Sequence, residues 1–479
     1  MSFSSLVSSD SCCPNLFNDP SNSFFTMVNV HVITQGCSAN QADSEVMKGL
    51  LAERGDALVS TEGEADVVVI NSCTVKGPTE TAFRRKLAEL DSLGKKVVVA
   101  GCIPQAGGKG LDRFSRIGTY QIERIGEAVS ETANGNIVTF LEREDRSRLN
   151  LPKVRNNQLI EIVPISHGCL SHCTYCKTKY ARGQLYSYRP RDIISHIEKA
   201  VRDGAKEVWL TSQDSSAYGL DINSNLAELL SQIVAIPHDF RLRLGMSNPL
   251  FFEQFLPAFV GIFRHPKIYK FLHVPLQAGN NHVLEKMKRG YTVEDFFTLV
   301  AAVRRAVPEL TLSTDIICGF PGETDEQFAD TITALRRIQP DVINISKFWP
   351  RPGTAASHME KVSGHAIKSR SKAVHDLFHR IALENNRKWV GWEGNVLISE
   401  VGKAGTMLGR NYCYKQVVVH GNPSLLGKEL RVMITDASAF DLKGMAIREE
   451  AIAAVSSLPQ PVGSFTLSMS QCPLKFRSQ

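Results

Sequence analysis

The sequence predicts an α/β protein made of three folded parts: an N-terminal doubly wound α/β domain, a central partial (β/α)6 barrel and a small C-terminal antiparallel β-barrel. Strand-like and helix-like segments alternate from residue 27 to about residue 388. After Gly391 only short strand-like segments remain, separated by Gly and Asn turns. We expect the following divisions: a tail at 1–26, domains at 27–145, 155–385 and 388–450, and a second tail at 451–479.

Composition indicates an ordinary soluble globular protein. The 479 residues suffice for two to four domains, and 43% of them are hydrophobic and 22% charged. The net charge of +6 permits an anionic partner. No stretch approaches the roughly 20 apolar residues that span a membrane, and the first basic residue is Lys48, so neither a secretory signal nor a transit peptide is predicted. We therefore expect a cytoplasmic protein that does not bind a membrane.

The tails carry little structural signal. Residues 1–26 are rich in Ser, Asn, Asp and Pro, a composition typical of disorder, and they include Cys12 and Cys13. Met27 stands directly before the first strand-like segment, so the sequence leaves open whether residues 1–26 are translated. The 451–479 segment, which contains Cys472, is expected to be a polar tail.

In the first domain, helices follow short apolar strands, which predicts a parallel sheet. One helix has Val46, Met47, Leu50 and Leu51 on one face and ends at Gly55, and another covers about 79–93. The strands are VNVHVIT at 28–34, DVVVIN at 66–71 and KVVVA at 96–100.

Three cysteines follow the three strands of this domain. Cys37, Cys73 and Cys102 each come just after a strand-like segment. Because the carboxyl ends of parallel strands meet at one edge of an open sheet, the three thiols should converge. A single cysteine at such a place could simply be a small buried hydrophobic residue. Three at equivalent strand ends favour an iron–sulfur cluster with three protein ligands.

The central domain holds a second cysteine group, the C-x3-C-x2-C motif of Cys169, Cys173 and Cys176. Thiolates are soft ligands that select iron–sulfur clusters, zinc or copper(I). A 4Fe–4S cluster takes one ligand per iron, so three cysteines leave one iron open. The alternative is a zinc knuckle completed by His167 or His172. With this motif, the eleven cysteines indicate thiols in a reducing compartment rather than a disulfide framework.

Polar side chains collect where the strands of the central domain end, which is where barrel enzymes place their sites. The six expected strands cover 159–166, 206–211, 241–244, 271–274, 311–318 and 342–347. The candidate site residues are Gln213, Asp214, Asn248, Gln277, Arg289, Asp315 and Glu323. Cys318 lies within the apolar run IICGF and is expected to pack.

The C-terminal part predicts a helix at 365–388 followed by a small β-barrel. From 351 to 388 there are eight Lys or Arg against three Asp or Glu, which indicates either a solvated face or a surface for phosphates. The expected strands lie at 394–401, 415–420 and 429–435. Arg410, Tyr412, Tyr414 and Lys415 could stack and pair with RNA, or could pack within the barrel.

These motifs resemble a known family. C-x3-C-x2-C with Tyr175 before its last cysteine is the signature of radical S-adenosylmethionine (SAM) enzymes. TQGCSANQADSEVM, INSCTV, AGC, HVPLQAGNNHVLEKMKRGYT, STDIICGFPGETDEQF and FWPRPGT resemble the methylthiotransferases within that superfamily, and the last part resembles their RNA-binding TRAM domain. KTKYARGQLYSY is similar to the archaeal and eukaryotic group that acts on N6-threonylcarbamoyladenosine in tRNA. The resemblance runs from about residue 29 to 450.

The resemblance implies two 4Fe–4S clusters and a radical mechanism. Cys169, Cys173 and Cys176 would hold the cluster that cleaves SAM to a 5′-deoxyadenosyl radical, and Cys37, Cys73 and Cys102 an auxiliary cluster that carries the sulfur. A second SAM would supply the methyl group, giving 2-methylthio-N6-threonylcarbamoyladenosine at position 37 of the tRNA. The target base would have to leave the anticodon-loop stack. The resemblance assigns SAM contact to the segments after Thr211, Pro275 and Asp315. It therefore implies the following SAM-binding residues: Gln213, Asp214, Gln277, Arg289 and Asp315.

Three other functions stay open at this point. Related methylthiotransferases act on isopentenyladenosine in tRNA or on an aspartate of a ribosomal protein. A non-catalytic zinc or iron–sulfur RNA-binding protein would also use clustered cysteines. The reaction needs an electron donor and a sulfur source as partners, and the sequence identifies neither.

Overall fold

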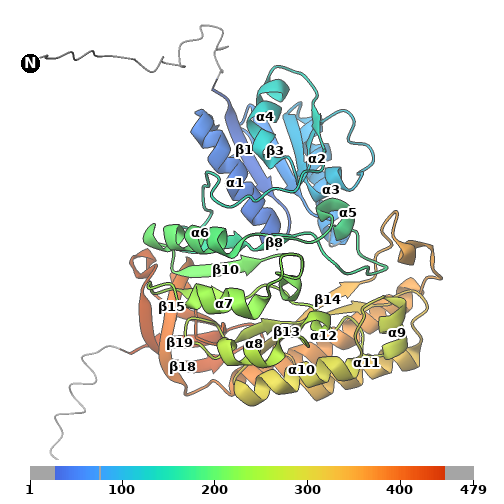
Figure 1. The fold of residues 1–479 in the computed structure, drawn as a ribbon, viewed down its shortest axis with the longest axis vertical. Coiled ribbons are helices and arrows are strands. Elements are labelled where there is room, and N and C mark those ends of the chain that lie inside the picture. The colour runs from blue at the N-terminus through green and yellow to red at the C-terminus, as the bar shows by residue number, and fades with distance from the viewer. Residues whose placement is uncertain (1–26, 75–76, 448–479) are drawn as a thin grey trace, which may run out of the picture. The chain divides into compact units, whose positions relative to one another are not determined.

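The computed structural model describes residues 27–74 and 77–447. The tails predicted at 1–26 and 451–479, with Cys12, Cys13 and Cys472, lie outside the described residues. The chain divides into two compact units, one up to Ala382 and one from Leu383 onward, and the ribbon in Figure 1 follows both.

A six-stranded parallel sheet forms the N-terminal part of the first unit, in the order β2-β1-β3-β4-β5-β6. The order reverses between β1 and β3, which confirms the doubly wound prediction. Strands β2, β5 and β6 were not predicted because two or three residues carry no readable period. The strands are β1 Asn29–Thr34, β2 Ala57–Leu58, β3 Val67–Ser72, β4 Lys96–Gly101, β5 Ser115–Ile117 and β6 Thr139–Phe140.

Helices cover both faces of this sheet (Figure 1). Val67 and Val69 of β3 pack with helices α1 and α4, whereas Val68 and Ile70 pack with helix α2 on the other side. Both faces of the strand are therefore buried, which is why its sequence is a continuous apolar run. The helices are α1 Ser38–Arg54, α2 Gly77–Ser92, α3 Cys102–Gln105 and α4 Ile125–Ala133.

Six parallel strands form the central part of the first unit, which confirms the partial barrel. They make two three-stranded groups, β11-β10-β7 and β12-β13-β14, joined by a parallel bridge from Leu242 to Ile268. The strands are β7 Ile160–Pro164, β10 Glu207–Thr211, β11 Arg241–Arg243, β12 Phe271–His273, β13 Thr311–Cys318 and β14 Val342–Lys347. The helices are α5 Thr178–Arg182, α6 Pro190–Arg202, α7 Leu226–Val234, α8 Leu256–Phe263, α9 Asn281–Lys286, α10 Val293–Ala306, α11 Asp325–Ile338 and α12 Gly364–Arg387.

The second unit contains a closed five-stranded barrel, β15-β16-β17-β19-β18. Its pairs are antiparallel except β17 with β19, which run parallel. This confirms the predicted small antiparallel barrel, with one parallel pair because an odd number of strands cannot alternate in direction around a closed ring. The strands are β15 Glu393–Val401, β16 Thr406–Arg410, β17 Gln416–His420, β18 Glu429–Ala437 and β19 Leu442–Ala446.

Two of the RNA-contact candidates in this barrel pack against protein groups. Lys415 is buried and its Nζ donates to Asn386 Oδ1 at 2.9 Å, so of its two possible roles the structure favours packing over contact with RNA. Arg410 lies over the ring of Tyr414 at 4.9 Å. Tyr412 is 38% exposed beside Trp389 and remains a candidate for stacking on a base.

In the part of the chain from 27 to 447 that the structure describes, none of the helices combines the length and the apolar character that crossing a bilayer requires.

We predict that Gly101→Ala destabilises the N-terminal sheet and displaces Cys102. Gly101 has φ of +92°, and a Cβ there would lie 2.2 Å from Asn71 Oδ1 and 2.6 Å from the Ser72 carbonyl oxygen. The strained backbone alone costs about 1–3 kcal/mol, so urea unfolding of the apoprotein should show at least that loss. Gly94→Ala is the control, because its φ is +65° but no atom lies within 4 Å. An equal loss in both variants would contradict the role of the close contact.

Candidate active site

A cavity of about 1680 Å³ lies in the first unit, where the carboxyl ends of the N-terminal sheet face those of the barrel strands. The structure brings together at its wall the six cysteines and the five residues predicted to bind SAM: Cys37, Cys73, Cys102, Cys169, Cys173, Cys176, Gln213, Asp214, Gln277, Arg289 and Asp315. Asn248 also lines it. Glu323 does not belong to the lining and instead pairs with Arg370 at 2.8 Å.

The first cysteine triplet lies where β1, β3 and β4 end. Asn40 of α1 contacts the chain beyond each end, because its Oδ1 accepts from Cys37 Sγ at 3.3 Å and its Nδ2 donates to the Ser72 carbonyl oxygen at 3.0 Å and to Cys102 Sγ at 3.9 Å. A hydrogen bond with Cys73 is the main cause that lowers the pKa of Cys37 to about 6. Burial raises the pKa of Cys102. The triplet therefore includes one thiol that ionises readily near neutral pH.

The second triplet lies on a loop that a short antiparallel ribbon closes. Strand β8 (Ser166–His167) pairs with strand β9 (Tyr186–Ser187) at the base of this loop. Gly168 begins the loop with φ of +77°, and a Cβ there would lie 1.6 Å from the Gln184 carbonyl oxygen. Only glycine fits at this position, so the chain can turn directly from the ribbon into the motif.

The histidines near this loop have other partners. His167 Nε2 lies 2.7 Å from Asp145 Oδ1, and its Nδ1 lies 3.4 Å from Tyr188 Oη. Both ring nitrogens thus have protein partners, which disfavours His167 as the residue that completes a zinc site. His172 Nε2 lies 3.3 Å from Lys179 Nζ.

The donor set fits iron–sulfur clusters better than single ions. Among the described residues, no three His, Cys, Asp or Glu side chains are grouped closely enough to bind one metal ion. A 4Fe–4S cluster takes one thiolate per iron and so holds its cysteines further apart than one tetrahedral ion does. Each triplet therefore suits a cluster with one open iron.

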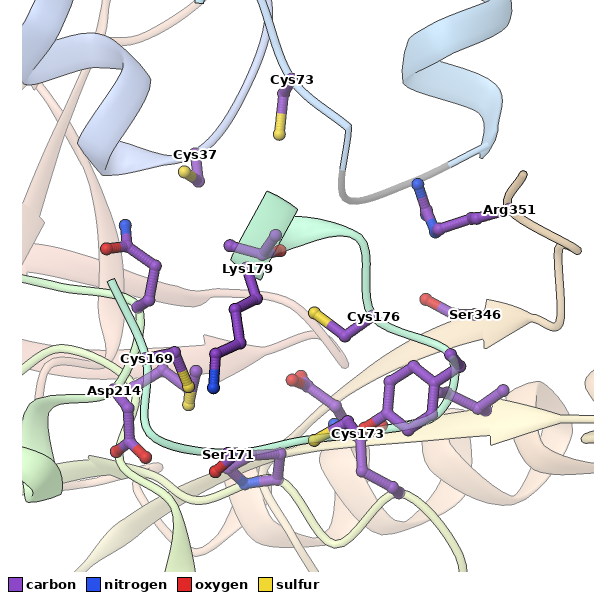
Figure 2. A pocket seen from close by; sticks show the side chains of 18 of the residues that line it. Cys37, Cys73, Cys169, Ser171, Cys173, Cys176, Lys179, Asp214, Ser346 and Arg351 are labelled. Carbon is purple, nitrogen blue, oxygen red and sulfur yellow. The ribbon is translucent and has the colours of Figure 1, made fainter. Parts of the chain in front are cut away.

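Figure 2 shows how the triplets face each other. Cys37 and Cys73 lie on one wall, Cys169, Cys173 and Cys176 lie on the opposite wall, and the Lys179 side chain extends toward the loop of the second triplet. Spacing along the chain does not reveal Lys179 as a lining residue, because its direction depends on how α5 packs. A substrate in the cavity can therefore meet both triplets.

Two residues predicted to bind SAM present unpaired acceptors. Asp214 Oδ1 accepts from Ser216 Oγ at 2.7 Å and from the Asn248 N–H at 2.9 Å. Asp214 Oδ2 and Gln213 Oε1 are buried and have no hydrogen-bond partner among the described residues. Burial also raises the pKa of Asp214. Such acceptors are costly unless a donor meets them, and SAM offers its amino group and ribose hydroxyls, so these residues fit SAM.

Gln277 has a strained backbone at the cavity wall. Its φ is +72°, unusual for a residue with a side chain. Its N–H donates to the Asp315 carbonyl oxygen at 2.8 Å, and its own carbonyl oxygen accepts from the Ile317 N–H at 3.0 Å. Strand β13 thus holds the strain in place, which is common at ligand sites.

Arg289 lies at the second triplet. Its Nη1 donates to Cys173 Sγ at 2.9 Å and its Nε donates to Tyr291 Oη at 3.1 Å. The cation lowers the pKa of the Cys173 thiol, although burial is the larger effect and raises it. Contact between Arg289 and SAM stays a prediction.

Sequence reasoning missed a buried ion network beside the first triplet. Asp43 of α1 accepts from Arg182 Nη2 at 2.6 Å and from Arg148 Nη1 at 2.8 Å. Burial alone would raise the pKa of Asp43, but the two guanidinium groups outweigh it and hold that pKa below its usual value. A signal existed, because Asp43 lies on the same helical face as the apolar Val46 and Met47.

We predict that Asp43→Asn destabilises the apoprotein by about 3–5 kcal/mol near neutral pH, because two buried guanidinium groups lose their counter-charge. A lowered pKa means that the carboxylate contributes its stability above the unfolded-state pKa, about 3.9, and loses it as the pH falls through the folded-state value. Urea unfolding at several pH values should therefore show a constant deficit above about pH 5 that shrinks in more acidic solution. A deficit that does not depend on pH would contradict this assignment.

Comparison with known families agrees with this geometry. Residues 163–335 match the radical SAM superfamily, residues 29–118 match uncharacterized protein family UPF0004, and residues 387–447 match the TRAM domain. Among solved structures, the radical SAM methyltransferase TsrM from Kitasatospora setae has a TM-score of 0.51 and 17% identity over 69% of this chain and 75% of that chain, which shows a shared fold.

Curated relatives match most of the chain. A threonylcarbamoyladenosine tRNA methylthiotransferase of Drosophila melanogaster is 43% identical over 88% of this chain and 78% of its own length. The human protein of that name is 40% identical over 88% and 74%. A probable enzyme of the same name from Pyrococcus horikoshii is 42% identical over 82% and 94%. The chain therefore belongs to the threonylcarbamoyladenosine tRNA methylthiotransferase family of radical SAM enzymes.

Proposed function

We propose that this protein converts N6-threonylcarbamoyladenosine at position 37 of tRNA to its 2-methylthio derivative by radical SAM chemistry. The observation that carries this proposal is the placement of two cysteine triplets on opposite walls of one cavity. Its relatives of 40–43% identity carry the name of this activity. The matched TRAM domain supports RNA as the substrate.

The residues that would hold the cofactors follow from the cavity wall. Cys169, Cys173 and Cys176 would bind one 4Fe–4S cluster, and Cys37, Cys73 and Cys102 would bind a second. Gln213, Asp214, Gln277, Arg289 and Asp315 would surround SAM. When bound, these groups supply the electron, the carbon radical, the sulfur atom and the methyl group.

The chain itself positions and shields the reactants. Both triplets line one cavity, which can receive a base that has left the anticodon-loop stack. Gln277 is held in place by its two backbone hydrogen bonds, and Asp315 Oδ1 accepts from His273 Nε2 at 2.9 Å. Fixed polar groups of this kind orient reactants without reorganising during the reaction.

The charge of the cavity suits an anionic substrate. Nine of its lining residues are Lys or Arg, against two Asp. Four of these cations are exposed and suit RNA phosphates: Arg85, Arg143, Lys288 and Lys347. The threonylcarbamoyl group adds a carboxylate, whereas an isopentenyl group carries no charge, so this balance favours the former.

The proposal includes the surroundings of the enzyme. Cysteine-bound clusters need reduced thiols, which supports a cytoplasmic location. The reaction requires an electron donor and a sulfur source as partners. The functional division proposed is an auxiliary-cluster domain at 27–145, a radical SAM domain at 155–385 and an RNA-binding domain at 388–450.

Nucleoside mass analysis tests the function. The protein, purified anaerobically and reconstituted to about eight iron atoms per chain, is given SAM, a reductant, sulfide and tRNA that carries N6-threonylcarbamoyladenosine. We expect a methylthio gain on that nucleoside. SAM cleavage without modified tRNA would contradict the substrate, and zinc with little iron would contradict the enzyme.

Single cysteine variants separate the two triplets. We predict that Cys173→Ala abolishes SAM cleavage, because one ligand of the SAM-cleaving cluster is lost. Cys73→Ala should keep SAM cleavage but lose sulfur insertion. Cys318→Ala is the matched control, since Cys318 is buried and does not line the cavity, and it should retain both activities. Normal thiolation by Cys73→Ala would show that the second cluster is wrongly assigned.

A further inference from the structure

The chemistry proposed above assigns no role to Arg182. This residue ends helix α5, which follows directly from the loop of the second triplet. Yet its side chain reaches the first triplet, where it lines the cavity beside Cys37 and Cys102. Only 3% of the residue is exposed. A buried cation of this kind needs a strong structural or functional reason.

The position of Arg182 is set from two sides. Its Nη2 donates to Asp43 Oδ2 at 2.6 Å, and its helix is bound to the N-terminal sheet by a hydrogen bond from Thr119 Oγ1 to the Ala181 carbonyl oxygen at 2.5 Å. Helix α3, which begins with Cys102, packs against the same helix. The guanidinium group is therefore held next to the first triplet.

Two cations share the one carboxylate of Asp43, so the network keeps a surplus positive charge. Arg182 places this surplus positive charge at the cavity wall that carries the first triplet. Arg182 lines the cavity together with Cys37 and Cys102, whereas Arg148 is not among the lining residues. The two arginines have the same partner and similar burial, but of the two only Arg182 lies at the cavity wall that carries the first triplet.

We propose that Arg182 is a positioning residue of the second iron–sulfur site, where its fixed guanidinium offsets the negative charge of the thiolate-bound cluster and raises its reduction potential. The inference rests on the second cluster of the proposed function. Reduction adds one electron to the cluster, so a fixed cation stabilises the reduced form more than the oxidised form. In a buried site this interaction is weakly screened.

The test isolates the second site in the full-length chain. Cys169, Cys173 and Cys176 are all replaced by Ala, and the parent protein is reconstituted with iron and sulfide to about four iron atoms per chain. Dithionite then supplies single electrons in the presence of mediators. The signal of the reduced cluster in electron paramagnetic resonance gives the midpoint potential.

We expect Arg182→Gln to lower the midpoint potential enough to change the ratio of reduced to oxidised cluster at least tenfold at a fixed potential, which is about 59 mV for one electron. Arg148→Gln is the matched control, because it removes the other partner of the same carboxylate, and it should leave the potential unchanged. Arg182→Lys keeps the charge and should restore most of the shift.

The possible results distinguish a failure of the second-cluster assignment from a failure of the inference about Arg182. A parent protein that binds no iron would overturn the second cluster and this inference with it. Equal potentials for Arg182→Gln and the parent, or equal shifts for Arg182→Gln and Arg148→Gln, would overturn the inference alone. If Arg182→Gln loses its cluster, Asp43→Asn and Asp43→Asn/Arg182→Gln are compared instead. Neither of these two proteins has a carboxylate at position 43, so the loss of Arg182 leaves no carboxylate there without its partner. The double variant should have the lower potential, and equal values would overturn the inference.

Discussion

The arrangement of this protein depends on the buried ion pairs that the carboxylate of Asp43 forms with Arg148 and Arg182. Asp43 lies on α1 of the N-terminal sheet and holds Arg182, at the end of the loop with the second triplet. Two residues further on, Glu45 of the same helix pairs with Lys153 at 3.1 Å, and Lys153 also pairs with Glu161 of β7. These buried ion pairs join the sheet to the barrel. Together with the apolar packing of Ala42 against Ile160 and Ile162 of β7, they fix the separation of the two sets of cysteines.

Both folds of the first unit use the same rule to build the cavity. Parallel strands bring their carboxyl ends to one edge, and loops at that edge carry the reactive side chains. Here two such edges face one another, one with Cys37, Cys73 and Cys102 and one with the barrel residues. The site is consequently enclosed by residues from most of the first unit, and its polar groups are held by hydrogen bonds from both backbone and side chains.

Strand ends made the site predictable, and packing made parts of it unpredictable. The cysteines could be placed because each follows an apolar strand, so topology alone brings them together. Arg289 could be assigned to the barrel end, but its bond to Cys173 joins residues 116 positions apart. For Lys415 the sequence left contact with RNA and packing within the barrel open, because strand alternation does not show that Asn386 supplies a buried partner. Strands β2, β5 and β6 were too short to recognise.

The sequence by itself determined the metal-binding chemistry, the α/β class and the order of the elements, because these depend on local spacing and on the period of apolar residues. The tertiary structure decided which charged residues meet. Asp43 and Arg182 are 139 positions apart. Asp43 sits in a helix whose period shows a buried face without showing what that face meets, and Arg182 ends a five-residue helix that is too short to show a period. Electrostatic partners inside a protein are chosen by packing across the chain, which the linear pattern of residues does not contain.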